Sequence, residues 1–252
     1  VAVDADRVGF YAEAIGADPS AWTREAPPGF GSVLLFAVAD LFLQHPKVVP
    51  FTATLLHVDQ SFTYLEPMAV GSVISMQGTI TRVRERGGSF FVTFEAEGAD
   101  DDTIIIRSVS TFVLSDQQAP PPDSERAEPA VRERATSEGE LRSASRHDLV
   151  RYAAATRDFN PFHWDHDVAV ASGLPGVVVH GLLMYAWMVE AAARAAGSAR
   201  VTDAKVRVRS ALHPGEQATL ATEVEGATVK VTLSRGDTAL VTGSATVAGD
   251  GE

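Results

Sequence analysis

Residues 180–190 read HGLLMYAWMVE, and residues 30–40 read FGSVLLFAVAD. Each stretch is apolar on nearly every face of a helix, which is typical of a helix wrapped by other structure. Both are followed by segments rich in Val, Ile, Thr and Phe and broken by glycines, a composition typical of β-strands. The sequence therefore predicts, twice, a long buried helix with an antiparallel sheet curled around it, which is an α+β arrangement.

The two helices belong to an internal repeat. YAEAIGADPSAW at residues 11–22 matches YAAATRDFNPFHW at residues 152–164 with one residue inserted. DQSFTYLEP at residues 59–67 parallels VRVRSALHP at residues 206–214. Because the matching pieces occur in the same order in both halves, duplication explains them better than chance.

The repeat divides the chain into two units. Residues 1–115 and 141–252 are each expected to fold in the same way and to pair side by side as a pseudo-dimer with one continuous sheet. Between them, residues 116–140 are rich in proline and charge and nearly free of large apolar side chains. Such a segment cannot bury enough apolar surface to fold alone, so we expect it to be a linker.

Each unit has the same expected layout of helix, loop, buried helix and four strands. The expected helices are residues 4–16, 31–44, 146–157 and 180–196, with Ser145 and Asp148 forming a capping box at the third. The expected strands are residues 51–65, 70–84, 89–98, 103–115, 201–212, 216–225, 227–235 and 238–248.

Composition narrows the functional classes. The chain carries 33 acidic residues against 21 Lys and Arg, a formal net charge of −12, so it has no general attraction to nucleic acid or to a membrane surface. It has no cysteine, which excludes disulfides, thiolate nucleophiles and thiolate metal sites. No apolar run reaches the ~18 residues needed to cross a bilayer, and no secretory signal is visible. We therefore expect a cytoplasmic enzyme or binding domain.

Residues 158–163, DFNPFH, carry the chemistry. Pro161 fixes its own φ and biases Asn160 away from helix, so the chain must turn out of the preceding helix here. A carboxylate and an imidazole five residues apart across such a turn are able to converge on one small space. His163 has an ordinary pKa near neutrality and Asp158 gains proton affinity if it is buried, so the pair is suited to acid–base chemistry.

A third requirement of water addition to an unsaturated thioester is a donor for the thioester oxygen. The predicted helix beginning at His180 and Gly181 offers free backbone N–H groups and a partial positive charge, and the glycine allows close approach. Without further support, an Asp and a His around a proline turn are more often a helix cap and a surface hydrogen bond.

The same residues resemble a known family. DFNPFH, then WDHDVAVASG and LPGVVVHGLL, is similar to the MaoC-like R-specific enoyl-CoA hydratase and (3R)-hydroxyacyl thioester dehydratase family, whose signature is D-x-N-P-(aliphatic)-H with a later H-G. Phe162 departs mildly from the aliphatic residue, and Arg157 stands where the family commonly has glycine. The likeness covers residues 140–248 well, and the first half only through the repeat.

The resemblance implies a double hot-dog fold and reversible syn hydration of trans-2-enoyl thioesters, on coenzyme A or an acyl carrier protein, to (3R)-3-hydroxyacyl thioesters. It implies that Asp158 and His163 activate water and move protons, that Asn160 orients them, and that Gly181 N–H, supported by His180, polarises the thioester carbonyl. It implies no metal and no cofactor. A hot-dog thioesterase and a non-catalytic acyl-binding subunit are the alternatives.

The repeat makes the two halves unequal. It places Ala17 opposite Asp158 and Ala21 opposite His163, so the first half lacks both proton-transferring groups. We therefore expect one active site per chain, with the first half as a scaffold that makes room for a longer acyl tail. Phe36, Phe62 and Tyr64 are candidates for lining that tunnel, with the filling of the core as the plainer interpretation.

Several basic side chains are candidate substrate contacts. Arg82 and Arg84 alternate along one predicted strand and Arg207 lies on another. In an acidic protein such cations are able to attract the phosphates of coenzyme A or of a carrier-protein arm, although most such rows are solvated strand faces. A homodimer of these double hot-dog chains is also expected.

Overall fold

The computed structural model describes residues 1–117, 139–197 and 200–248. Most of the expected linker, residues 118–138, lies outside the described residues. Residue 140, which we expected in the linker, begins a short strand instead. Among the described helices, none is long and apolar enough to cross a membrane.

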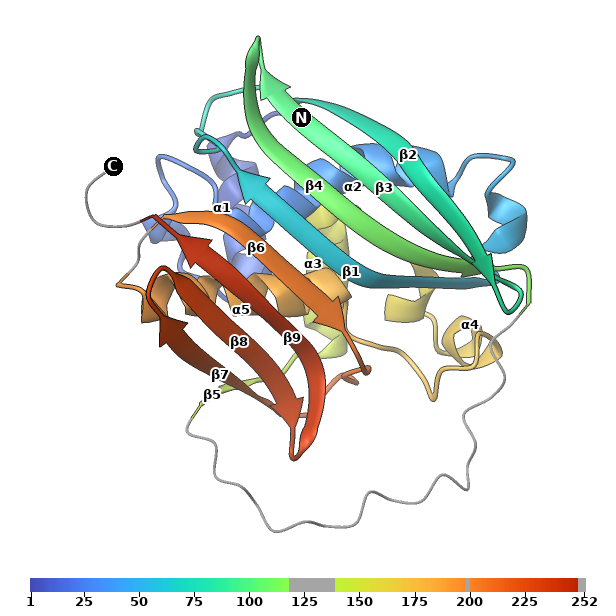
Figure 1. The fold of residues 1–252 in the computed structure, drawn as a ribbon. Coiled ribbons are helices and arrows are strands. Elements are labelled where there is room, and N and C mark those ends of the chain that lie inside the picture. The colour runs from blue at the N-terminus through green and yellow to red at the C-terminus, as the bar shows by residue number, and fades with distance from the viewer. Residues whose placement is uncertain (118–138, 198–199, 249–252) are drawn as a thin grey trace.

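A single nine-stranded sheet runs through both halves in the order β2-β3-β4-β1-β6-β9-β8-β7-β5, with every neighbouring pair antiparallel (Figure 1). The strands of the first half are Thr54–Tyr64 (β1), Ser75–Arg86 (β2), Ser89–Asp100 (β3) and Thr103–Ser115 (β4). Those of the second half are Glu140–Arg142 (β5), Val201–Val208 (β6), Ala218–Glu225 (β7), Thr228–Arg235 (β8) and Thr238–Val247 (β9).

The helices lie together behind the sheet (Figure 1). They are Ala5–Ala14 (α1), Gly31–Leu43 (α2), Arg146–Thr156 (α3), His166–Ala171 (α4) and Gly181–Ala195 (α5), with 3₁₀ turns at Pro19–Ala21 (η1), Pro28–Phe30 (η2), Val49–Phe51 (η3) and Pro161–His163 (η4). Most side chains of α2 and α5 are buried, because the curled sheet covers them. The α+β double hot-dog expectation is confirmed.

Two expected strands are shorter in the structure, for local reasons. Residues 70–74 turn at Gly71 and hold the N-terminal segment, since Gly71 N–H donates to Val3 O and Val3 N–H donates to Ser72 O. Residues 209–212 leave the sheet, and Leu212 O accepts from Val179 N–H. The capping box at α3 is confirmed, because Ser145 accepts from Asp148 N–H and Asp148 accepts from Ser145 N–H.

The two halves meet along β1 and β6, the central strands of the sheet. Asp59 and Arg207 are register partners there, and two hydrogen bonds of 2.6 and 3.2 Å join the carboxylate to the guanidinium. Two buried hydroxyl–hydroxyl contacts also cross between the halves. Tyr152 donates to Ser32 over 3.2 Å, and the hydroxyl groups of Tyr64 and Tyr185 lie 2.6 Å apart.

The internal repeat appears in the structure as the same turn after α1 and after α3. After α1, Gly16 takes a left-handed conformation with φ of 76°, and Asp18 then caps η1. After α3, Arg157 takes the same conformation with φ of 68°, and Asn160 caps η4. A glycine adopts positive φ without a steric penalty, whereas a side chain at such a position is strained. A glycine at position 157, as in the family pattern, would therefore adopt this backbone conformation without strain.

This pair of turns gives a stability prediction. Arg157→Gly should raise the free energy of unfolding by about 1 kcal/mol, because it removes the left-handed strain. The matched change Gly16→Ala should lower it by about 1 kcal/mol, since an added Cβ at position 16 meets no atom within 4 Å and only the backbone conformation opposes it. Thermal unfolding of both variants measures this, and shifts of about 3 °C in opposite directions are expected. A destabilised Arg157→Gly protein would contradict the prediction.

Candidate active site

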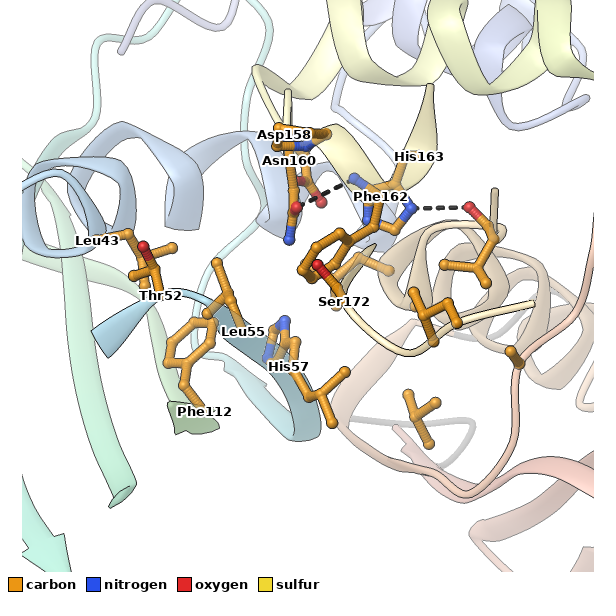
Figure 2. Close-up of a pocket in the computed structure, with 18 of the residues that line it drawn as sticks. Leu43, Thr52, Leu55, His57, Phe112, Asp158, Asn160, Phe162, His163 and Ser172 are labelled. Carbon is orange, nitrogen blue, oxygen red and sulfur yellow. Dashed lines mark hydrogen bonds between the residues drawn. The ribbon is translucent and has the colours of Figure 1, made fainter. Parts of the chain in front are cut away.

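Asp158 and His163 face the same space in the second half of the chain (Figure 2). The left-handed turn at Arg157 ends α3, and η4 then brings the chain back so that both side chains project from one short segment. One carboxylate oxygen of Asp158 and one ring nitrogen each of His163 and His180 lie within 4.8 Å of one another. The structure thus brings together the acid–base pair that the sequence predicted, with His180 beside it.

The tautomer of His163 follows from one hydrogen bond. Its Nδ1 lies 2.8 Å from the carbonyl oxygen of Val178. A carbonyl only accepts, so Nδ1 carries the hydrogen and Nε2 of the neutral ring keeps a lone pair. Val178 is itself fixed, because its N–H donates to Phe162 O. The ring is therefore held at one nitrogen and is free to accept a proton at the other.

The carboxyl group of Asp158 has a raised pKa. Burial is the largest cause, and His163 and the N–H of Asn160 oppose it. A further rise comes from the negative charge of Asp40, which belongs to α2 of the first half. A carboxyl group with a raised pKa beside an imidazole is a suitable pair for proton exchange.

His180 is fully buried and stacks on His163, with ring centroids 3.7 Å apart and an angle of 25° between planes. Burial and the neighbouring His163 lower its pKa well below the ordinary value, so the ring is neutral. Its Nε2 lies 3.2 Å from the carbonyl oxygen of Asp158, which makes Nε2 the donor. His180 thus contacts both residues. Its ring stacks on the ring of His163, and its Nε2 donates to the backbone carbonyl of Asp158.

The same three side chains are of the kinds that bind metal ions. A histidine binds a metal along the lone pair in its ring plane, and nearly parallel stacked rings direct their lone pairs side by side. His163 Nδ1 and His180 Nε2 are engaged with carbonyl oxygens, so the ring nitrogens that keep a lone pair are His163 Nε2 and His180 Nδ1.

Gly181 begins α5 and lines the same pocket. As the first helical residue, its N–H has no carbonyl one turn earlier to bond, and it carries part of the positive end of the helix dipole. An added Cβ at this position would lie 3.3 Å from Val208, so a side chain would crowd the space in front of the helix. This is the placement that the sequence predicted for the oxyanion donor.

The pocket has a volume of about 1060 Å³ and is lined by both halves of the chain. It lies where the β1–β6 pair ends, since His57 and Val58 of β1, Val208 at the end of β6 and the following Arg209 form part of its wall. This volume is at the upper end of the range for ligand sites, ~300–1,000 Å³. Phe36 of α2 lines it, as expected for a tunnel residue.

Phe62 and Tyr64 do not line this pocket, in contrast to our expectation. They are 1% and 5% exposed, and Phe62 packs against Tyr185 with ring centroids 5.3 Å apart. A Cβ added to Gly31, the repeat counterpart of Gly181, would lie 3.1 Å from the ring of Phe62. These aromatic side chains therefore occupy the space in front of α2 that stays open in front of α5.

The arginines that line the pocket also differ from those that the sequence predicted. Arg82 and Arg84 are exposed on the edge strand β2 and are not part of the pocket wall. Arg207 is committed to Asp59, which raises its pKa. Two other arginines line the pocket, Arg157 and Arg209. The sequence alone does not show that Arg207 is paired, because its partner Asp59 lies 148 residues away.

His57 is the pocket residue that sequence reasoning missed (Figure 2). A single histidine inside the predicted strand of residues 51–65 gives no local signal of a site. The ring packs against Phe112 with centroids 4.6 Å apart, and its Nε2 lies 3.1 Å from Gln60 Oε1, which also accepts from Ser110. Burial lowers the pKa of His57 to about 4. A neutral imidazole thus lies in the apolar wall contributed by the first half.

Each half of the chain matches a known family model. Residues 125–245 match the family described as MaoC like domain, and residues 1–107 match the FAS1-like dehydratase domain region. A curated relative named UPF0336 protein, from Clavibacter michiganensis, is 28% identical over 130 residues, which are 46% of this chain and 87% of that protein.

Solved structures show the same fold over nearly the whole chain. HtdX of Mycobacterium tuberculosis superposes with a TM-score of 0.79 at 20% identity, covering 98% of this chain and 97% of that one. A MaoC-like dehydratase of Phytophthora capsici gives 0.72 at 20% identity, with coverage of 98% and 93%. An acyl-ACP thioesterase of Bacteroides thetaiotaomicron gives 0.62 at 10% identity, with coverage of 90% and 92%. Because the fold is shared with a thioesterase, the chemistry has to be argued from the site.

The buried imidazole in the pocket wall gives a pH prediction. Because the pKa of His57 is lowered from 6.5 to about 4 on folding, the unfolded chain takes up the proton first as the pH falls, and stability is lost between these two values. His57→Phe should flatten this loss, by at most about 1.4 kcal/mol per pH unit for one proton. Denaturant unfolding from pH 7 to 4 measures the slope, with the exposed His147→Phe as control. Equal slopes in both variants would contradict the prediction.

Proposed function

We propose that this protein, whose residues 125–245 belong to the MaoC like domain family, reversibly adds water to trans-2-enoyl thioesters and forms (3R)-3-hydroxyacyl thioesters. A hydratase or dehydratase role is supported by both family matches. The observation that carries the proposal is the convergence of Asp158 and His163 in one pocket with the N-terminus of α5.

The proposed reaction uses the pair as one unit. In the direction of hydration, a water molecule lies between Asp158 and His163, and its oxygen adds to C3 of the substrate. His163 Nε2, whose lone pair is free, takes a proton from this water. Asp158, with its raised pKa, delivers a proton to C2 from the same face. Return of the proton from His163 to Asp158 resets the pair.

The thioester oxygen becomes negatively charged as C3 is attacked. The N–H of Gly181 and the positive end of α5 stabilise this charge, because they are oriented before the reaction begins. Asn160 accepts from Phe162 N–H over 3.3 Å, and its own N–H lies 3.4 Å from Asp158. It thereby fixes the turn that carries the pair, which makes Asn160 a positioning residue.

The first half contributes the wall for the acyl tail. Its repeat positions Ala17 and Ala21 lack proton-transferring groups, and Phe62 lies in front of α2. One active site per chain follows, with coenzyme A or an acyl carrier protein as the carrier of the acyl group. Residues 1–115 are then the non-catalytic unit and residues 141–252 the catalytic unit. Assembly of two chains into a homodimer stays a prediction.

The test is turnover of crotonyl-CoA and longer trans-2-enoyl-CoA substrates, followed as loss of the conjugated absorbance. Asp158→Asn and His163→Gln should each lower kcat by about 10²–10⁴-fold, and the double variant should lose little more, because the two groups act as a unit. Asp167→Asn and His166→Gln are matched controls, since both side chains are exposed in the same segment.

Two outcomes would contradict the proposal. One is the absence of turnover on every chain length, and the other is full turnover by Asp158→Asn. Free thiol is measured in the same reactions, because a thioesterase would release it and a hydratase would not. A chain that binds acyl-CoA without either reaction would instead be an acyl-binding subunit. Chiral analysis of the 3-hydroxyacyl product checks the (3R) configuration.

A further inference from the structure

The wall that the first half contributes to the pocket is not uniformly apolar. It carries the imidazole of His57 beside Leu55 and Phe112, and next to Leu43 it carries the hydroxyl of Thr52 (Figure 2). The carboxylate of Asp40, in the last turn of α2, completes the set. For a plain hydrocarbon tail these groups are a disadvantage, because each polar atom left without a partner in a desolvated pocket costs ~1–3 kcal/mol.

The hydrogen bonds of these side chains show which atoms are left for a ligand. Gln60 Oε1 is an acceptor, since the amide nitrogen of Gln60 donates to Ser61 O. His57 Nε2 is therefore the donor to Gln60, and Nδ1 of the neutral ring keeps its lone pair. Thr52 uses its hydrogen on Val49 O over 2.8 Å. What His57 and Thr52 have left is acceptor capacity.

Asp40 adds further acceptor sites and a negative charge. One of its oxygens accepts from Gln44 Nε2 over 2.6 Å, and an ionised carboxylate has further acceptor sites and no donor. Its charge is felt across the pocket, since it raises the pKa of Asp158. Together, the three side chains form a subsite that lacks free donors and carries a negative charge. Its complement is a group that donates hydrogen bonds and carries no negative charge.

We propose that Asp40, Thr52 and His57 form a specificity subsite for a hydroxyl group carried by the acyl chain beyond the reacting C2–C3 bond. This inference rests on the proposed function, because it names the class of substrate for the same pocket. A methyl-ended tail would donate to none of these acceptors, whereas a hydroxyl group donates one hydrogen bond. A carboxylate-ended tail would meet the charge of Asp40 and find no donor. The expected order of preference is hydroxyl, then methyl, then carboxylate.

The experiment compares trans-2-enoyl-CoA substrates of six, eight and ten carbons that end in a hydroxyl, a methyl or a carboxylate group. At the chain length that reaches the subsite, kcat/KM should be about tenfold higher for the hydroxyl than for the methyl end, the effect of one well-made hydrogen bond. An apolar tunnel would give the opposite order, since a hydroxyl loses its hydration there. Equal values or a methyl preference at all three lengths overturn the proposal.

Variants assign the effect to the subsite. His57→Phe should lower the ratio of hydroxyl to methyl turnover below one, and the exposed His147→Phe should leave it unchanged. Asp40→Asn keeps the shape and removes the charge, so it should weaken discrimination against the carboxylate. Each ratio is taken within one preparation, so the amount of folded protein cancels. An unchanged ratio in both His57→Phe and Asp40→Asn overturns the assignment.

Binding separates this inference from the proposed function. Calorimetry with saturated decanoyl-CoA and 10-hydroxydecanoyl-CoA, and with their six- and eight-carbon pairs, measures the preference without any reaction. A hydroxyl preference in binding together with no turnover of any enoyl substrate would reject the hydratase and support the subsite. Turnover without a hydroxyl preference would support the hydratase and reject the subsite.

Discussion

The pairing of β1 with β6 is the constraint on which the site depends. It joins the two halves into one sheet and sets their register at Asp59 and Arg207. Where this pair ends, His57 of the first half and Arg209 of the second lie in the same pocket wall. A slip of one residue would exchange the two faces of each strand. The acid–base pair in the second half would then face a different wall.

The β1–β6 pair has two ends, and different side chains lie at each of them. At one end, the turn at residues 157–163 carries Asp158 and His163 in front of an open helix N-terminus. At the other end, the matching turn carries alanines, and Phe62 covers Gly31. Burying large aromatic side chains is strongly favourable. The loss of one potential site thus adds to the core that holds the halves together.

Much of the fold was predictable from the sequence because its signals are local. Buried helices, strand boundaries at glycines and the capping box at Ser145 depend on residues a few positions apart. The proximity of Asp158 and His163 was predictable for the same reason, since a single proline turn brings the two side chains together. Contacts between the two halves were not predictable. That Phe62 fills the core, that Arg207 is already paired and that His57 lines the pocket all depend on how two distant segments pair in space.

The electrostatic balance of the site also depends on the pairing of the halves. The second half supplies a carboxyl group with a raised pKa, a histidine held at one nitrogen and a second, neutral histidine stacked on it. Asp40 of the first half adds to this, because its negative charge raises the pKa of Asp158. The first half therefore acts on this carboxyl group through its charge, as well as forming one wall of the pocket.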